Sequence, residues 1–221
     1  MSTTVKVWDL PTRLFHWSLV ACVAGMFITA QIGGNAMAWH FRCGYSILTL
    51  LLFRLIWGVV GGKWSRFSSF FYGPSAVRSY LNGQRSPDQS IGHNPLGAWS
   101  VFAMLGILLL QVASGGFSDD EIAYAGPLVK FASNAIVGNA TFYHKSLGKL
   151  LLLGLLALHI GAIAFYYFKA GENLVTAMIK GNKQSPVASP SSRDDMLSRT
   201  LAAILFVACA SLVALLVQLA G

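Results

Sequence analysis

Histidine is the residue type in this chain with the clearest potential for chemistry. Four of the five histidines fall within or at the ends of long apolar segments, namely His16, His40, His144 and His159. An ionisable side chain inside a membrane segment is costly, and such residues usually mark a functional site. Imidazole nitrogen is a common ligand of haem iron and of other transition metals. The four histidines therefore predict a haem or metal site.

The elements that must position these side chains are five apolar segments of membrane-spanning length. Of 221 residues, 55% are hydrophobic and 11% are charged, whereas a soluble chain carries about 25% charged residues. Roughly twenty residues suffice to cross a hydrocarbon core about 30 Å thick as a helix. The segments are approximately 14–34, 40–61, 95–116, 144–168 and 200–220. Because lipid offers the backbone no hydrogen-bond partners, the sequence predicts an all-α integral membrane protein with one helix bundle.

Lysine and arginine predict the orientation, because they gather on the cytoplasmic side of a membrane. One side of the predicted topology carries eleven of these residues and the other carries four, while Arg54 lies inside the second segment. The eleven are Lys6, Arg13, Lys63, Arg66, Arg78, Arg85, Lys169, Lys180, Lys183, Arg193 and Arg199. We therefore expect a cytoplasmic N-terminus and an outward C-terminus. The net charge of +8 is then a topology signal and does not indicate nucleic-acid binding.

This topology sorts the four histidines into two pairs by depth. His40 and His144 lie at the outer level, whereas His16 and His159 lie at the inner level. Two histidines at one depth on different helices can supply both axial ligands of a six-coordinate haem. The fifteen residues from His144 to His159 rise about 22 Å as a helix, so two haems can stack across one membrane.

The spacing of His144 and His159 also determines how far apart their side chains point around the helix axis. Fifteen helical steps leave the side chains of His144 and His159 about 60° apart around the helix axis, and a single π-bulge between them would bring the two faces together. Gly44 and Gly148 each follow a histidine of the outer pair by four residues, in matching H-x-x-x-G patterns. A missing side chain there lets a flat macrocycle lie against the backbone.

Basic side chains at both levels are candidates for pairing with anionic haem propionates. Arg42, Lys145 and Lys149 lie at the outer level, and Arg13 and Arg54 lie at the inner level. Arginine suits this role because its planar guanidinium matches a carboxylate. The alternative for the three outer residues is that they anchor their helices at the membrane interface.

His93 has no partner at its depth and stands in the segment IGHNPLG. Pro95 begins a predicted helix, and Asn94 is a suitable cap for it, so His93 can simply be an interfacial residue at a helix start. Alternatively, His93 and Asn94 bind a quinone head group. Imidazole exchanges protons near neutral pH, and both side chains can hydrogen-bond a quinone carbonyl.

Several of these pieces together resemble the bacterial cytochrome b561 family, which includes the cytochrome b subunits of nickel-iron hydrogenases. The pieces are VWDLPTRLFHW, the pattern H-x-x-x-G-x(9)-RLIWGVVG, IGHNPLG, and the paired histidines followed by ENLVTAMIKGNK. They cover about residues 5–184. We therefore expect a cytochrome b561-like domain at 1–184, and at 185–221 a linker with an additional transmembrane helix.

The resemblance implies a four-helix transmembrane bundle holding two haem b groups, ligated by His16, His40, His144 and His159. The fifth, C-terminal transmembrane helix is expected from its apolar composition and lies outside the resemblance. The resemblance also implies electron transfer in the bacterial inner membrane between quinone or quinol and a periplasmic partner, either a c-type cytochrome or hydrogenase subunits. Whether the chain also acts as a quinone oxidoreductase stays open. The gap from His144 to His159 is one residue longer than the family pattern, and a π-bulge would absorb the extra residue.

Two other functions are compatible with buried histidines. Within the family's range is a self-sufficient oxidase of superoxide that passes electrons to quinone without a partner, and basic residues near the outer haem would attract such an anion. A metal-ion transporter is more remote. Transporters place their sites near mid-membrane with broken helices, whereas here the histidines split into two levels and no Asp or Glu lies inside a predicted span.

Overall fold

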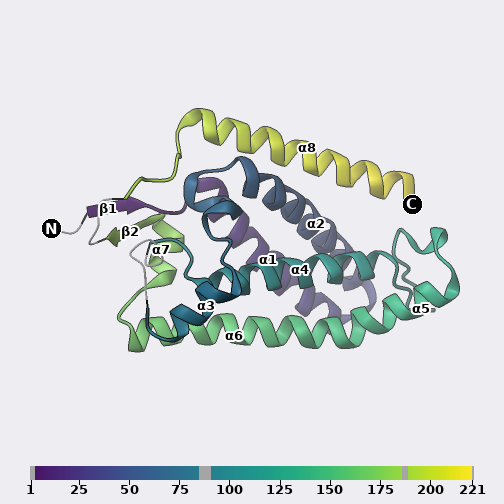
Figure 1. Ribbon diagram of the computed structural model, residues 1–221. Helices are drawn as coiled ribbons and strands as arrows, with labels where there is room; N and C mark the ends of the chain where they lie inside the picture. Colours follow the sequence, from purple (N-terminus) through teal and green to yellow (C-terminus); the bar gives the residue numbers. More distant parts are fainter. Residues whose placement is uncertain (1–2, 85–90, 186–188, 221) are drawn as a thin grey trace. The chain divides into compact units, whose positions relative to one another are not determined.

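The computed structural model describes residues 3–84, 91–185 and 189–220, so Arg85, which the sequence assigns to the cytoplasmic side, lies outside the described part. Within this part, five helices are long and apolar enough to cross a membrane. They are α1 (Leu10–Ile32), α2 (Met37–Val60), α4 (Pro95–Gly116), a continuous run at Asn134–Lys169, and α8 (Met196–Ala220) (Figure 1). The chain is an all-α, multi-pass membrane protein, as predicted.

The fourth spanning helix is longer than its apolar pattern indicates. It runs for 36 residues, whereas the sequence predicts a start near residue 144. It consists of α5 (Asn134–Phe142), a π-helical turn (Tyr143–Leu147) and α6 (Gly148–Lys169). Asn134 and Asn139 interrupt the apolar run of α5, which is why composition alone places the helix start too late. The π turn expected between the two histidines of this helix lies at its His144 end.

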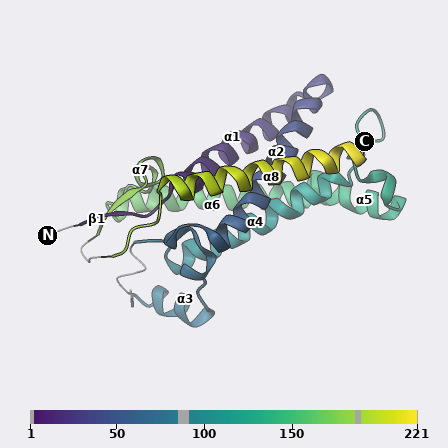
Figure 2. The same cartoon turned by 90° about the horizontal axis from the view of Figure 1, so that it is seen from above.

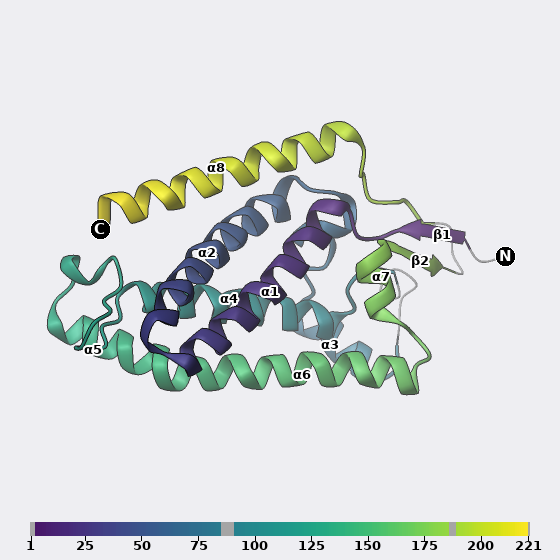
Figure 3. The ribbon, with the colours of Figure 1, turned by 180° about the vertical axis from the view of Figure 1, so that it is seen from behind.

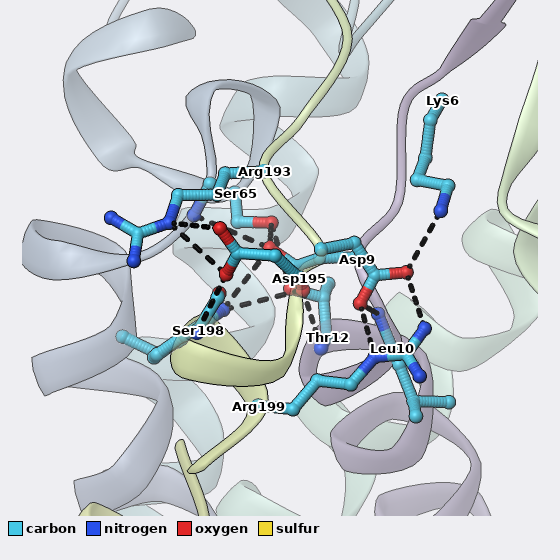
Figure 4. A network of polar contacts seen from close by, with 12 residues as sticks. Lys6, Asp9, Leu10, Thr12, Ser65, Arg193, Asp195, Ser198 and Arg199 are labelled. Atoms are coloured by element: carbon cyan, nitrogen blue, oxygen red, sulfur yellow. Dashed lines mark hydrogen bonds and ion pairs between the residues drawn. The ribbon is translucent and has the colours of Figure 1, made fainter. Parts of the chain in front are cut away.

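The start of α1 is fixed by a buried carboxylate. Asp9 is fully buried, and its Oδ1 accepts a hydrogen bond of 2.8 Å from the backbone N–H of Thr12. Its Oδ2 accepts a hydrogen bond of 2.7 Å from Ser65 Oγ, and both residues belong to the polar network drawn in Figure 4. Pro11 sits in the first turn, where its missing N–H costs nothing. Asp9 therefore acts as the cap of α1 and ties that helix to the loop after α2.

Two short helices and one small sheet lie between the spanning helices and at the N-terminus, and the sheet was not expected from the sequence. The helices are α3 (Pro74–Leu81) and α7 (Leu174–Lys180). Strand β1 (Thr3–Lys6) pairs antiparallel with β2 (Asn182–Ser185), with Thr3 opposite Ser185. Figure 2 shows β1 beside α7, and the N–H groups of Val7 and Trp8 donate to the carbonyl of Gly181 at 2.8 and 3.0 Å.

The segment before α8 is held by Asp194, whose side chain is 1% exposed. Its carboxylate binds Lys6 Nζ at 3.2 Å and Arg199 Nε at 2.9 Å, and it accepts from the backbone N–H of Leu10 at 3.3 Å. Burial disfavours the charged form, but these donors outweigh it and lower the pKa of Asp194 to about 2. Asp194 therefore links the start of α8 to the N-terminal segment.

The chain packs as two compact units, each assembled from separate segments. The first comprises Met1–His16, Arg54–Ala103 and Ala157–Ile204, and the second comprises Trp17–Phe53, Met104–Leu156 and Leu205–Gly221. The first has an apolar core that contains Val5, Val7, Trp8, Trp64, Ile91 and Ala177. In the second, α1 leads into α2 through a 3-10 turn at Gly34–Ala36 (Figure 3). The domain division at residue 184 stays a prediction.

Candidate functional site

Each compact unit contains one of the two histidine pairs expected from depth. In the second unit, the rings of His40 on α2 and His144 in the π turn have centroids 6.1 Å apart at an interplanar angle of 86°. In the first unit, the rings of His16 on α1 and His159 on α6 have centroids 6.5 Å apart at 53°. The structure therefore brings together the residues that the topology argument pairs.

Both separations suit a single iron between two imidazoles. Imidazole nitrogens bind first-row metals at about 2.0–2.1 Å, which places the ring centres of two opposed ligands roughly 6 to 6.5 Å apart. A direct hydrogen bond between two rings would bring them closer. The side chains present in both units thus fit the coordination of a haem by two histidines.

Hydrogen bonds fix the tautomer of the His40–His144 pair. Nδ1 of His40 lies 3.1 Å from the carbonyl oxygen of Met26, and Nδ1 of His144 lies 2.9 Å from that of Gln111. A carbonyl oxygen only accepts, so each Nδ1 carries the proton and donates. Nε2 of each ring then keeps its lone pair. Metal-binding histidines are typically held in this way, with the second nitrogen donating to a carbonyl.

A pocket of about 450 Å³ in the second unit is lined by both His40 and His144. Its other lining residues are mostly apolar, and they include Gly44 and Lys145. Gly115 belongs to the same lining, and a Cβ added there would stand 2.8 Å from Cε1 of His144. The absence of a side chain at Gly115 therefore lets the His144 ring approach the backbone of α4.

Gly148, the second glycine of the matching patterns, has a different neighbour. A Cβ at Gly148 would overlap Oε1 of Gln111 and would stand 2.6 Å from Cε1 of Tyr143. Gly44, by contrast, has only Met26 Cε within 4 Å of such a Cβ, at 3.8 Å. Gly44 thus borders the pocket, whereas Gly148 makes room for a glutamine. A role for either glycine against a haem stays a prediction.

The guanidinium groups expected near the His16–His159 pair each have one buried nitrogen without a hydrogen-bond partner among the described residues. Arg13 donates from Nη1 to the carbonyl of Ile179 at 2.6 Å, and its Nε is buried without a partner among the described residues. Arg54 is 3% exposed, lies over the ring of Phe67 at 4.6 Å, and has a buried Nη1 that likewise lacks a described partner. Such donors fit the anionic groups of a haem edge.

The outer basic residues have surface positions. Arg42 lies over the ring of Trp39 at 4.7 Å, an arrangement typical of an interfacial cation. Lys145 lines the pocket, and Lys149 is exposed. Pairing of these side chains with propionates stays a prediction.

His93 is held between two aromatic rings in the first unit. Its ring centroid lies 4.3 Å from that of Phe70 and 4.7 Å from that of Trp8. Its Nδ1 is buried and has no hydrogen-bond partner among the described residues. Burial, together with the nearby charges of Arg54 and Lys183, lowers the pKa of His93 to about 3. The imidazole is therefore neutral at physiological pH.

Asn94 caps α4, as its position before Pro95 predicts. Its Oδ1 accepts from the backbone N–H of Gly97 at 2.8 Å, and its Nδ2 donates to the hydroxyl of Tyr166 at 2.6 Å. Tyr166 in turn shares a hydrogen bond of 2.9 Å with Tyr80 on α3. Both the oxygen and the nitrogen of the Asn94 amide are thus already hydrogen-bonded, so a ligand could bind this amide only by displacing one of these partners.

Comparison with known proteins agrees with this arrangement. A model of the prokaryotic cytochrome b561 family matches residues 7–181, which include every histidine discussed above. The chain belongs to the prokaryotic cytochrome b561 family. It is accordingly a membrane cytochrome of the b type, and haem b is its expected prosthetic group in electron transport. No solved structure matches the chain.

Three relatives of this cytochrome b561 family protein are described as probable Ni/Fe-hydrogenase B-type cytochrome subunits. The chain is 27% identical over 135 residues to the probable Ni/Fe-hydrogenase 1 B-type cytochrome subunit of Escherichia coli (strain K12), covering 49% of this chain and 57% of that protein. It is 27% identical over 219 residues to the probable Ni/Fe-hydrogenase B-type cytochrome subunit of Azotobacter chroococcum mcd 1, covering 81% and 88%. The corresponding protein of Azotobacter vinelandii is 31% identical over 144 residues, covering 52% and 59%. The match thus spans just over half the length of two of these relatives.

Sequence reasoning missed three contributors to the cytochrome's histidine sites. Asp9 directly before Leu-Pro is a helix-start signal that could have been recognised. Gln111 is an uncharged polar residue inside a predicted span, and such residues tend to hydrogen-bond across helices. Gly115 carries no specific signal, because glycine is common in membrane helices.

Proposed function

We propose that this cytochrome carries electrons across the bacterial inner membrane through two haem b groups, between the quinone pool and a periplasmic partner. The strongest support is that the histidines lie in two pairs. The ring centroids are 6.1 Å apart in one pair and 6.5 Å apart in the other. Haem b, when bound, supplies a one-electron carrier. The couple His40 and His144 would ligate one group, and His16 and His159 the other.

The protein's own contribution is to hold the ligands in place. The carbonyls of Met26 and Gln111 fix the protonated Nδ1 of His40 and His144, so Nε2 is the nitrogen of each ring that would bind a haem iron. Asp9 fixes the start of α1 and so the helical position of His16. Arg13 and Arg54 present buried donors that would meet carboxylates.

The periplasmic partner in this proposal is a hydrogenase or a c-type cytochrome. The names of the relatives from Escherichia coli and the two Azotobacter species favour a hydrogenase. The distribution of lysine and arginine favours a cytoplasmic N-terminus and a periplasmic C-terminus.

The quinone is assigned to the side of the membrane where α4 begins, two residues after His93. The neutral imidazole of His93 has a buried nitrogen without a described partner, which can hydrogen-bond a quinone oxygen. Asn94 can contribute only by giving up its bond to Tyr166. His93 is thus the principal residue of this site, and Asn94 the secondary one.

Haem quantification tests the two-haem assignment. Acid acetone should extract two non-covalent haem b groups per chain from fully loaded protein, with a reduced-minus-oxidised spectrum that contains two components. One haem per chain, or a covalently retained haem, would contradict it.

The kinetics of haem oxidation by quinone test the proposed quinone site at His93 and Asn94. His93→Ala should slow haem oxidation by a soluble quinone about tenfold while both haems stay bound. Asn94→Ser keeps an oxygen that can cap α4, and Asn173→Ala removes a comparable cap from α7, so these two variants control for loss of helix capping. An unchanged rate in a His93→Ala, Asn94→Ser double variant would move the quinone elsewhere.

A further inference from the structure

The backbone around His144 departs from α-helical hydrogen bonding. In an α-helix the N–H of Gly148 would donate to the carbonyl of His144, four residues earlier. Here the N–H of Gly148 donates to Tyr143, five residues earlier, and closes the π turn Tyr143–Leu147. The carbonyl of His144 therefore loses its α-helical donor. A π turn leaves a buried carbonyl of this kind in need of another partner.

Gln111 of α4 supplies that partner. Its Nε2 donates to the carbonyl oxygen of His144 at 2.9 Å. Its backbone carbonyl accepts from Nδ1 of the same histidine, also at 2.9 Å. One residue thus holds His144 twice, once through the main chain and once through the imidazole. The two bonds together fix both the backbone register and the direction of the ring.

The packing around Gln111 is arranged for this contact. Gly148 lies directly beside the amide, and even a single added carbon at Gly148 would overlap Oε1 of Gln111. That Oε1 is buried and has no partner among the described residues. An unsatisfied buried carbonyl is unfavourable, so a glutamine here is worse than an apolar residue unless its N–H groups are needed. Here an N–H group of Gln111 is needed as the hydrogen-bond donor to the carbonyl of His144.

We propose that Gln111 is a positioning residue that maintains the π turn and thereby aims His144. The proposal rests on the proposed function, in which His144 is an axial ligand of haem. It accounts for a polar side chain at this position of α4, because the amide of Gln111 satisfies the carbonyl that the π turn leaves without its helical donor.

The test combines a substitution with a deletion. Gln111→Met keeps the length of the side chain and the backbone bond to Nδ1, but it removes the donor to the His144 carbonyl. We expect the haem held by His40 and His144 to be lost to an acceptor apoprotein about tenfold faster, as is typical when a partner of a metal ligand is removed. Gln218→Met, the same change at an exposed position of α8, should have no effect.

Deletion of Ser146 removes one residue from the π turn and converts it into an α turn. In the shortened chain Gly148 follows Tyr143 by four residues and Lys149 follows His144 by four, so the carbonyl of His144 gains the N–H of Lys149 as its α-helical donor and Gln111 becomes dispensable. In the deleted chain, Gln111→Met should therefore change the haem transfer rate by less than about twofold. If Gln111→Met accelerates haem loss equally in both backgrounds, or in neither, Gln111 does not act through the π turn.

A haem-independent measurement keeps the inference testable if a variant loads poorly. In the apoprotein, Gln111→Met should accelerate amide hydrogen exchange in the peptide around Tyr143–Leu147, and Gln218→Met should not. Equal exchange in both variants would contradict the inference. The proposed function fails separately, namely if the unmodified protein binds no haem that depends on His144.

Discussion

The ring of His144 lies against the backbone of α4 at Gly115, where an added Cβ would stand 2.8 Å from Cε1 of the ring. Side-chain carbons do not approach this closely, so the ring or the helix must move if Gly115 gains a side chain. We expect Gly115→Ala to weaken retention of the haem on His40 and His144 about tenfold, measured by haem transfer to an acceptor apoprotein. Gly106→Ala, on the same helix with nothing within 4 Å, is the control. Equal retention in both would show that the ring has room to move.

The pairing of the histidines predicts which variants resemble one another. His40→Ala and His144→Ala should each remove the same component of the reduced-minus-oxidised spectrum, while His16→Ala and His159→Ala remove the other. His93→Ala should keep both components, because His93 packs between Trp8 and Phe70 and not against another histidine. Loss of the same component in the His16 and His40 variants would overturn the pairing.

The buried imidazole of His93 predicts a specific acid sensitivity. Its pKa is about 3 in the folded protein against an ordinary 6.5, so between these values the unfolded chain binds a proton that the folded chain does not. The free energy of unfolding then falls as pH decreases from 6.5, by about 3 kcal/mol at pH 4.5. His93→Phe should remove this contribution, and its melting temperature in detergent should fall less than that of the parent between pH 7 and 4.5. Parallel melting curves would contradict the assignment.

Asp194 predicts a second loss of stability in acid, at lower pH. Its folded pKa of about 2 lies below the ordinary 3.8, so the carboxylate stabilises the fold at pH values above about 4. That stabilisation is lost as pH falls toward 2. Asp194→Asn should lower the free energy of unfolding by roughly 1–3 kcal/mol at pH 7, and the difference should vanish near pH 2. Asp195→Asn changes the neighbouring exposed carboxylate but keeps an oxygen that can accept from the N–H of Ser198, so this control should leave the free energy of unfolding nearly unchanged.

The spanning helices could be predicted because their signal is compositional. Twenty consecutive apolar residues have few alternatives in a membrane, and depth along each helix follows from counting. The same counting placed His40 beside His144 and His16 beside His159, and the structure brings both pairs together. The assignment of these four residues as ligands stays a prediction.

The hydrogen-bond partners of the histidines could not be predicted in the same way. The carbonyls of Met26 and Gln111 meet the imidazoles because of helix rotation. Rotation is not encoded in a helix that is apolar on all faces. The β1–β2 sheet was missed for another reason. Its strands TTVK and NKQS are short and polar, so neither shows the alternation that identifies a strand.

The pairing of β1 with β2 also has a consequence in time. Lys6 lies opposite Asn182, so nearly the whole chain must be synthesised before the first strand meets its partner. At 5–20 residues per second, β1 waits roughly 10–35 s on the ribosome with an open edge. The helices α1, α2, α4 and α6 all leave the ribosome during this interval. Closure of the strand pair is therefore a late event in biogenesis, and a chain truncated before Asn182 would present β1 to other proteins indefinitely.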